Sequence, residues 1–196
     1  MSNQFTELLI KTCEKGNPEN VRILIEKGAD VNVIDTNGST PLVTTCMFGF
    51  VDTARLLVDS GAQVNVKNKL GNTPLLYACV RGHLGTARLL MARGADVNVQ
   101  DNNGDAPLIL ASRNGHIDIV KLLAEYKADL NVQDKFGNTP LMNACMRMHT
   151  GIASFLIERG ADLTITNKEN KTALDIAAKM RLESVVNNMK RRDQRR

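Results

Sequence analysis

The stretch Gly71-Asn72-Thr73-Pro74-Leu75 decides the fold, because related stretches begin at Gly38, Gly104 and Gly137, each 33 residues from the next. The same register places five leucines one period apart: Leu24, Leu57, Leu90, Leu123 and Leu156. A fixed period of this length indicates stacked supersecondary units, none of which can bury its apolar face alone. The chain is therefore expected to form a row of packed interfaces instead of one central core.

The copy at residues 68–100 shows how one unit is built. Thr73 lies where a helix N-cap is needed, and Pro74 falls in the first turn, where a missing N–H is harmless. We expect a first helix that ends at Gly82 and a second helix that ends before Gly94, since glycine readily adopts the left-handed conformation that stops a helix. The polar residues that follow are expected to form a projecting loop.

The pattern G-x-T-P-L, a pair of small residues, Gly-His, a Leu-Leu pair and Gly-Ala-Asp-Val-Asn resembles the ankyrin repeat. This resemblance covers residues 1 to about 189. It implies an all-α repeat solenoid, an ankyrin-type stack of helix-turn-helix units with projecting loops. Four full repeats are expected between two capping repeats, followed by a basic tail: 1–34 (N-terminal cap), 35–67, 68–100, 101–133, 134–166, 167–189 (C-terminal cap) and 190–196 (tail).

The net charge of +4, from 25 Lys and Arg against 21 Asp and Glu, comes entirely from the tail at 190–196. The rest of the chain is neutral, so a basic surface that would favour nucleic acid is not expected on the repeats. No run approaches the roughly 18 apolar residues of a membrane span, and the first residues lack the pattern of a secretion signal. We expect an intracellular protein, cytoplasmic or nuclear or both, that does not enter membranes.

The four cysteines occupy one repeat position, because Cys13, Cys46, Cys79 and Cys145 are separated by 33, 33 and 66 residues. The other copies have Ser112 or Ala178 there. Equivalent positions of neighbouring packed helices lie about 8–10 Å apart, too far for a disulfide. These thiols are therefore predicted to be reduced, buried and equivalent to small apolar side chains.

The three histidines, His83, His116 and His149, follow the same 33-residue spacing. Side chains one repeat apart cannot converge on one zinc ion, and no Ser-His-Asp or Cys-His arrangement is left for nucleophilic catalysis. No phosphate-binding glycine motif follows a strand-like run. We therefore expect no metal, no cofactor and no catalytic residue: the protein is predicted not to be an enzyme.

Two residues depart from the repeat pattern, because Lys127 and Met148 stand where the other full copies have glycine. Each is expected to adopt a positive φ, at a cost of about 1 kcal/mol. Both flank the junction between the third and fourth full copies. Residues 120–155 are therefore predicted to open most readily.

The resemblance implies a non-catalytic module for protein–protein interaction: an adaptor, a scaffold or a stoichiometric inhibitor. Its partner would bind in a concave groove and at the loop tips, where residues of the family vary. On this chain these positions are Thr36, Asn37, Met47, Phe48, Lys69, Leu70, Asn72, Tyr77, Arg81, Asn102, Asn103, Asp105, Leu110, Arg113, Lys135, Phe136, Asn138, Met146 and Arg147.

Several of these residues suggest the chemistry of the partner. Arg81, Arg113 and Arg147 are in register and would form a basic ladder, beside loop-tip apolar residues such as Leu70 and Phe136. We expect a monomer that binds an acidic protein or peptide with apolar anchor residues. The alternative is that the arginines only solvate a helix face and that the apolar residues pack on neighbouring loops.

A different function is suggested by the tail, where Lys190, Arg191, Arg192, Arg195 and Arg196 lie within seven residues. Such a cluster can act as a nuclear import signal or contact phosphate groups. The alternative function is thus a nuclear regulatory protein that uses this tail for import or for association with nucleic acid. A solvated helix end is the simpler interpretation of the same residues.

Overall fold

A computed structural model describes residues 4–194, and over that range its secondary structure consists of helices without any strand. The expected all-α repeat fold is confirmed. The chain divides into two compact units, one ending at Asn102 and one beginning at Asn103. Within the described part of the chain, no helix has the length and apolar character needed to cross a bilayer.

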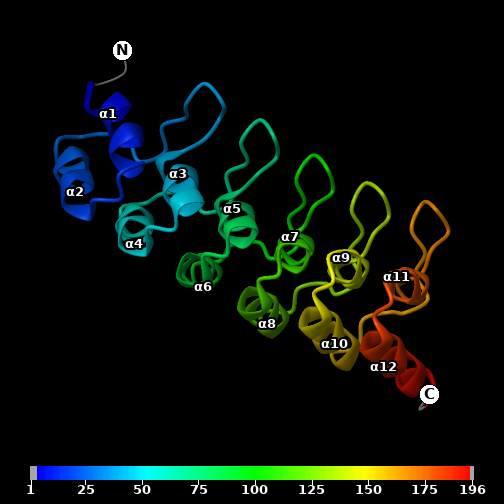
Figure 1. Cartoon of the computed structure of the whole chain (residues 1–196). Helices are drawn as coiled ribbons and strands as arrows, with labels where there is room; N and C mark the ends of the chain where they lie inside the picture. Colours follow the sequence, from blue (N-terminus) through cyan, green and yellow to red (C-terminus); the bar gives the residue numbers. More distant parts are fainter. Residues whose placement is uncertain (1–3, 195–196) are drawn as a thin grey trace. The chain divides into compact units, whose positions relative to one another are not determined.

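The first unit is a stack of three helical hairpins (Figure 1). The first helices of the hairpins pack against one another in one row, and the second helices pack in a second row behind them. The hairpins are α1 (Gln4–Cys13) with α2 (Pro18–Glu26), α3 (Pro41–Phe48) with α4 (Val51–Asp59), and α5 (Pro74–Arg81) with α6 (Leu84–Ala92).

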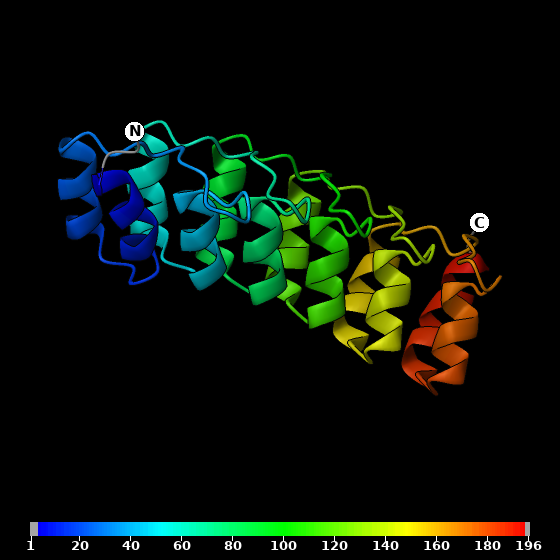
Figure 2. The ribbon, with the colours of Figure 1, turned by 90° about the horizontal axis from the view of Figure 1, so that it is seen from above.

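The second unit repeats this arrangement, and its two rows remain separate when the ribbon is viewed from above (Figure 2). Its first helices are in contact in the order α7, α9, α11, and its second helices in the order α8, α10, α12. The hairpins are α7 (Pro107–Asn114) with α8 (Ile117–Glu125), α9 (Pro140–Met146) with α10 (Thr150–Glu158), and α11 (Ala173–Lys179) with α12 (Glu183–Asp193).

The helix boundaries follow from the residues that the repeat supplies. The hydroxyl of Thr73 accepts the N–H of Leu76, Pro74 begins α5, and Gly82 ends the helix with a φ of 80°. An N-cap of this kind satisfies one of the backbone donors that a helix start leaves unpaired. Ala106, which precedes α7, is an exception because it has no side chain to make the bond.

The repeat register also sets the core of each unit. All five leucines of the 33-residue series are buried, as are all four cysteines. Because stacked hairpins reuse the same position in the interface between neighbours, a small or apolar side chain is needed there in every copy. The sequence prediction of buried, unpaired cysteines is confirmed.

Positive φ angles occur at the two non-glycine positions that the sequence singled out. Lys127 has a φ of 63° and Met148 a φ of 58°, as predicted. Asn170 and Arg181, in the last hairpin, have φ values of 56° and 57° and were not predicted. Since left-handed backbone is costly for residues with a Cβ atom, the second unit contains several strained helix ends and turns.

Projecting loops precede the first helices, and an Asx residue holds each described loop base. In the loop before α5, the side-chain oxygen of Asn68 accepts the N–H groups of both Leu70 and Asn72. Adjacent loops are joined by backbone hydrogen bonds, such as that from Lys69 N–H to the Asn37 carbonyl. The loop tips are therefore fixed to one another by the backbone, which positions the side chains of the candidate site.

Candidate functional site

The candidate site consists of the loop tips and the accessible residues of the first helices, which we call the inner face of each unit. In the first unit, Leu70 is 63% exposed at a loop tip, and Phe48 is 45% exposed at the end of α3. The other predicted residues there are exposed or half-buried: Thr36, Asn37, Met47, Lys69, Asn72, Tyr77, Arg81 and Asn102. All of these side chains are at least partly accessible to a partner.

A hollow of about 520 Å³ lies on the inner face of the first unit. It is lined by Asn37, Met47, Lys69, Leu70 and Tyr77, which the sequence had assigned to one site. The Tyr77 hydroxyl accepts a hydrogen bond of 3.0 Å from the buried Asn68 amide, which holds its ring in the wall. Phe48 lies outside this hollow and stacks on Phe50, with 6.0 Å between ring centroids.

The second unit has a hollow of about 460 Å³ between α7 and α9. Its rim contains Asn103 and Lys135 from the loops and Met146 and Arg147 from the end of α9. The Lys135 ammonium donates to the Asn103 side-chain oxygen over 2.7 Å, which joins two adjacent loop tips. Exposed residues at this rim are thus fixed by contacts between neighbouring repeats.

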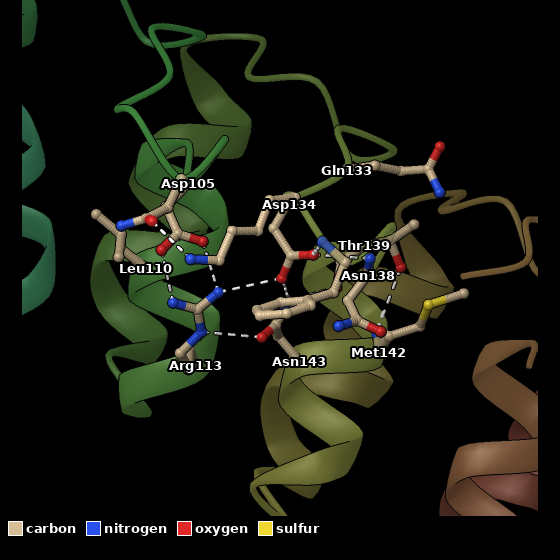
Figure 3. Close-up of polar contacts among 12 residues, drawn as sticks. Asp105, Leu110, Arg113, Gln133, Asp134, Asn138, Thr139, Met142 and Asn143 are labelled. Atoms are coloured by element: carbon tan, nitrogen blue, oxygen red, sulfur yellow. Dashed lines mark hydrogen bonds and ion pairs between the residues drawn. The ribbon is translucent and has the colours of Figure 1, made fainter. Parts of the chain in front are cut away.

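The floor of this α7–α9 hollow is a polar cluster around Arg113 (Figure 3). The two terminal nitrogens of Arg113 donate to both carboxylate oxygens of Asp105, over 2.7 and 2.5 Å. One of them also meets Asp134 at 3.2 Å, and Arg113 Nε donates to the Asn143 side chain at 2.9 Å. A guanidinium with two carboxylates and an amide around it is well satisfied and fixed in position.

The charge of Arg113 is consequently used inside the protein. Partial burial by itself would lower the pKa of Arg113, but the hydrogen bonds and the charges of Asp105 and Asp134 outweigh burial and raise it. The guanidinium therefore stays ionised and paired. The predicted basic ladder is wrong at this position: Arg113 is a structural residue, whereas Arg147 and Arg81 are exposed.

Three further residues of the predicted site are buried and cannot be primary contacts. Asp105 is held by Arg113, and Leu110 packs into α7 as part of the core. Asn138 accepts a hydrogen bond from the Asn167 side chain over 2.9 Å. Their positions in the repeat are of the exposed type, but their local partners cover them.

Asp134 was missed as a functional residue, although it organises the centre of the second unit. One of its oxygens accepts the N–H groups of Phe136 and Asn138 at 2.9 Å each, while the other meets Arg113 and Asn143. The signal was present in the sequence as an Asp or Asn every 33 residues: Asp35, Asn68, Asp101, Asp134 and Asn167. An Asx side chain that caps its own loop at this position explains that series.

A second hollow in this unit, also about 460 Å³, lies between α9 and α11 and is called here the α9–α11 slot. Its apolar lining consists of Phe136, Met146, Ile176 and Met180. Phe136 and Met146 line both this slot and the α7–α9 hollow, so they form the ridge between the two. The sequence predicted the ridge but not the far wall on α11.

The cysteines and histidines have structural surroundings. Burial raises the pKa of the Cys13 thiol to about 11 and that of Cys145 to about 12, so that both remain protonated and poorly nucleophilic near neutral pH. His83 hydrogen-bonds to the Met47 carbonyl at 3.2 Å, and His149 to the Arg113 carbonyl at 3.3 Å. Over residues 4–194, no group of three or more potential ligands is placed to hold a metal ion.

The basic tail begins inside a helix. Lys190, Arg191 and Arg192 belong to the last turns of α12. Arg192 donates to the carbonyls of Ile157 and Ala161 at 3.1 and 2.6 Å, and so satisfies backbone acceptors near the end of α10. The remaining tail residues Arg195 and Arg196 lie outside the described residues.

Comparison with protein families identifies the repeat. Residues 8–101, 63–134 and 108–190 match the family model described as ankyrin repeats in three copies. A search among curated proteins found no significant match. Ankyrin repeats are generally modules for protein–protein interaction and are typically non-catalytic. With matches that span residues 8–190 and an architecture of stacked helical hairpins with projecting loops, the chain belongs to the ankyrin-repeat family.

Proposed function

We propose that this protein is a non-catalytic interaction module that binds a partner protein through the inner face and acts as an adaptor, a scaffold or a stoichiometric inhibitor. The observation that carries the proposal is the exposure of large apolar side chains on that face. Leu70 is 63% exposed and Phe136 58%, at equivalent tips of two different loops. Large apolar side chains that gather on one face of a protein are typical of binding surfaces.

Fixed loops support the same proposal. The backbone bond from Lys135 N–H to the Asn103 carbonyl, and that from Lys168 N–H to the Phe136 carbonyl, connect successive tips in the second unit. Tips that are already ordered lose little conformational freedom when a partner binds. Exposed side chains on such tips can contribute most of their burial energy to affinity.

We also propose that the protein is a monomer in the cytoplasm, the nucleus or both. All four cysteines are free and buried, which fits a reducing compartment. Light scattering of the purified chain and fractionation of cells that express it test these two points. A dimer, or a protein found only in a secretory fraction, would contradict them.

The main proposal is tested by affinity capture with matched variants. Leu70→Glu with Phe136→Glu alters the inner face in both units. Ile23→Glu with Tyr126→Glu is the control, because these apolar residues are each 40% exposed and belong to α2 and to the end of α8, in the second rows. Proteins captured by the wild type should be retained by the control and lost from the inner-face variant. Equal capture by both variants would refute the proposal.

The tail-dependent alternative has weaker support, because Arg192 is engaged with α10. A variant with Lys190, Arg191, Arg195 and Arg196 changed to glutamine, and with Arg192 retained, removes four charges without removing that contact. We expect unchanged capture of the partner by this variant. Loss of the partner, or loss of a polynucleotide bound by the wild type, would favour the nuclear alternative.

A further inference from the structure

The α9–α11 slot combines an apolar interior with a basic rim. Phe136, Met146, Ile176 and Met180 supply the apolar part, and Ile176 and Met180 come from α11. Phe136 is 58% exposed, Met146 and Met180 are half-buried, and Ile176 is buried at the base. Flexible methionine side chains can adjust to a ligand group of variable shape. A single apolar side chain from a partner would fit such a slot.

Lysines surround this apolar centre. Lys168 and Lys171 lie on the loop before α11, and Lys179 lies at the end of that helix; all three side chains line the slot and are exposed. Among residues 4–194, neither Lys168 nor Lys179 has an ion-pair partner within 4.0 Å. Their charges are therefore available to a ligand.

Two carboxylates also line the slot, but they differ in availability. Asp175 completes a capping box with Thr172, whose N–H and hydroxyl both donate to Asp175 Oδ2 at 2.8 Å. The N–H and hydroxyl of Thr172 lower the pKa of Asp175, in keeping with an ionised side chain that is already engaged. Glu169 is thus the single exposed carboxylate of the slot that is not part of a helix cap. Available charge at the rim is predominantly positive.

Phe136 lies between two of the cations. The Lys135 ammonium is 5.2 Å from the centre of its ring, and Lys168 N–H donates to the Phe136 carbonyl at 3.0 Å. A ligand that covers the Phe136 ring must therefore pass close to both lysines. Acidic groups on either side of an apolar anchor would meet these lysines and Lys179, whereas basic groups would be repelled.

We propose that the α9–α11 slot binds an acidic peptide segment that inserts one apolar side chain against Phe136, Met146 and Met180. This inference rests on the proposed function and assigns the chemistry of the partner to one place on the inner face. The carboxylates of the segment contact Lys168 and Lys179. A polynucleotide would also match the charge, but the lining of the slot favours an aliphatic side chain over a phosphate group.

The test begins with selection of peptides from a random displayed library on the full chain. Enriched peptides should share an aliphatic or aromatic residue flanked by Asp or Glu. Their binding should weaken as salt concentration rises, because exposed charges are screened. Enrichment of basic or uncharged peptides would overturn the inference.

Variants then locate the bound peptide. Lys168→Glu with Lys179→Glu, and separately Phe136→Ala, should each reduce the affinity of a labelled enriched peptide by at least about tenfold, as expected for the loss of strong interface contacts. Lys121→Glu with Lys190→Glu is the matched control, since both lysines are exposed on second-row helices and the change in charge is the same. The control should bind as the wild type does.

The outcomes separate this inference from the proposed function. Binding that survives both slot variants but is lost with Leu70→Glu overturns the slot and retains an inner-face site. Binding that survives every inner-face variant contradicts both. A labelled single-stranded oligonucleotide serves as the competing probe, and if it binds more tightly than the peptides and depends on Lys168 and Lys179, the peptide proposal is refuted.

Discussion

Arg113 joins three parts of the second unit, because its partners Asp105, Asp134 and Asn143 come from two loops and from α9. Replacement by Met would leave two carboxylates with little solvent access and no countercharge. We expect Arg113→Met to lower the free energy of unfolding by about 2 kcal/mol, below the loss typical of a fully buried pair because Arg113 is 25% exposed. Denaturant titration measures this loss.

Arg147→Met is the matched control at the equivalent position of the next repeat. Its side chain is exposed, so the expected change in stability is within about 0.5 kcal/mol. Similar losses from both substitutions would show that the cluster around Arg113 does not stabilise the fold.

Ser112 occupies the position that cysteine fills in three of the other described copies. Its hydroxyl is buried without a hydrogen-bond partner among residues 4–194. Removing an unsatisfied buried polar group relieves a desolvation penalty, so Ser112→Ala should raise stability by about 1 kcal/mol. Thermal unfolding should show the opposite trend for Ser154→Ala, whose hydroxyl accepts a bond from Asn188. A loss of stability in Ser112→Ala would contradict this account.

The sequence revealed individual residues to the extent that the repeat determines them. Arg113 and Arg147 are equivalent by register, yet only Arg113 is paired. The reason is local: the carboxylates Asp105 and Asp134 at Arg113 correspond to the amides Asn138 and Asn167 in the next repeat. A comparison of repeat positions beyond the arginines would have indicated this difference, because an amide cannot neutralise a guanidinium.

At the scale of a single helix, the start of α7 lacks the cap that its neighbours have. Thr40, Thr73 and Thr139 each accept an N–H three residues later, whereas Ala106 cannot. Ala106→Thr should therefore stabilise the protein by about 1 kcal/mol, the usual contribution of an N-cap side chain. Denaturant titration of the variant measures the gain.

The reverse change supplies the control for this helix. Thr139 is as buried as Ala106, which shows that the position accepts threonine in the next copy. Thr139→Ala should cost a similar amount of stability. If Ala106→Thr destabilised the protein while Thr139→Ala had no effect, side-chain caps would not determine where these helices begin.

Helix positions were predictable because Thr, Pro and Gly mark their ends in the sequence. The hydrogen-bonded loops were only partly predictable. Projection follows from polar residues and glycine, but the bonds between tips, such as Lys69 to Asn37, join residues from different repeats. The α9–α11 slot was missed for the same reason, since its far wall is formed by Ile176 and Met180 of the divergent last hairpin.

At the scale of the whole molecule, the left-handed residues predict where the structure opens first. Lys127 and Met148 both lie within residues 120–155, and both have positive φ. We expect amide hydrogens of this segment to exchange faster than those of α3 to α6. Lys127→Gly with Met148→Gly should slow the exchange, because each glycine relieves about 1 kcal/mol of backbone strain. Protection that is uniform from 41 to 155, or unchanged in the variant, would contradict the prediction.

Binding through the inner face is the central claim, and amide exchange of the protein with and without a captured partner tests it most directly. The account predicts new protection at the loop tips around Leu70 and Phe136 and along α3, α5 and α9, with little change in the second-row helices. Protection confined to α4, α6, α8 and α10 would contradict it.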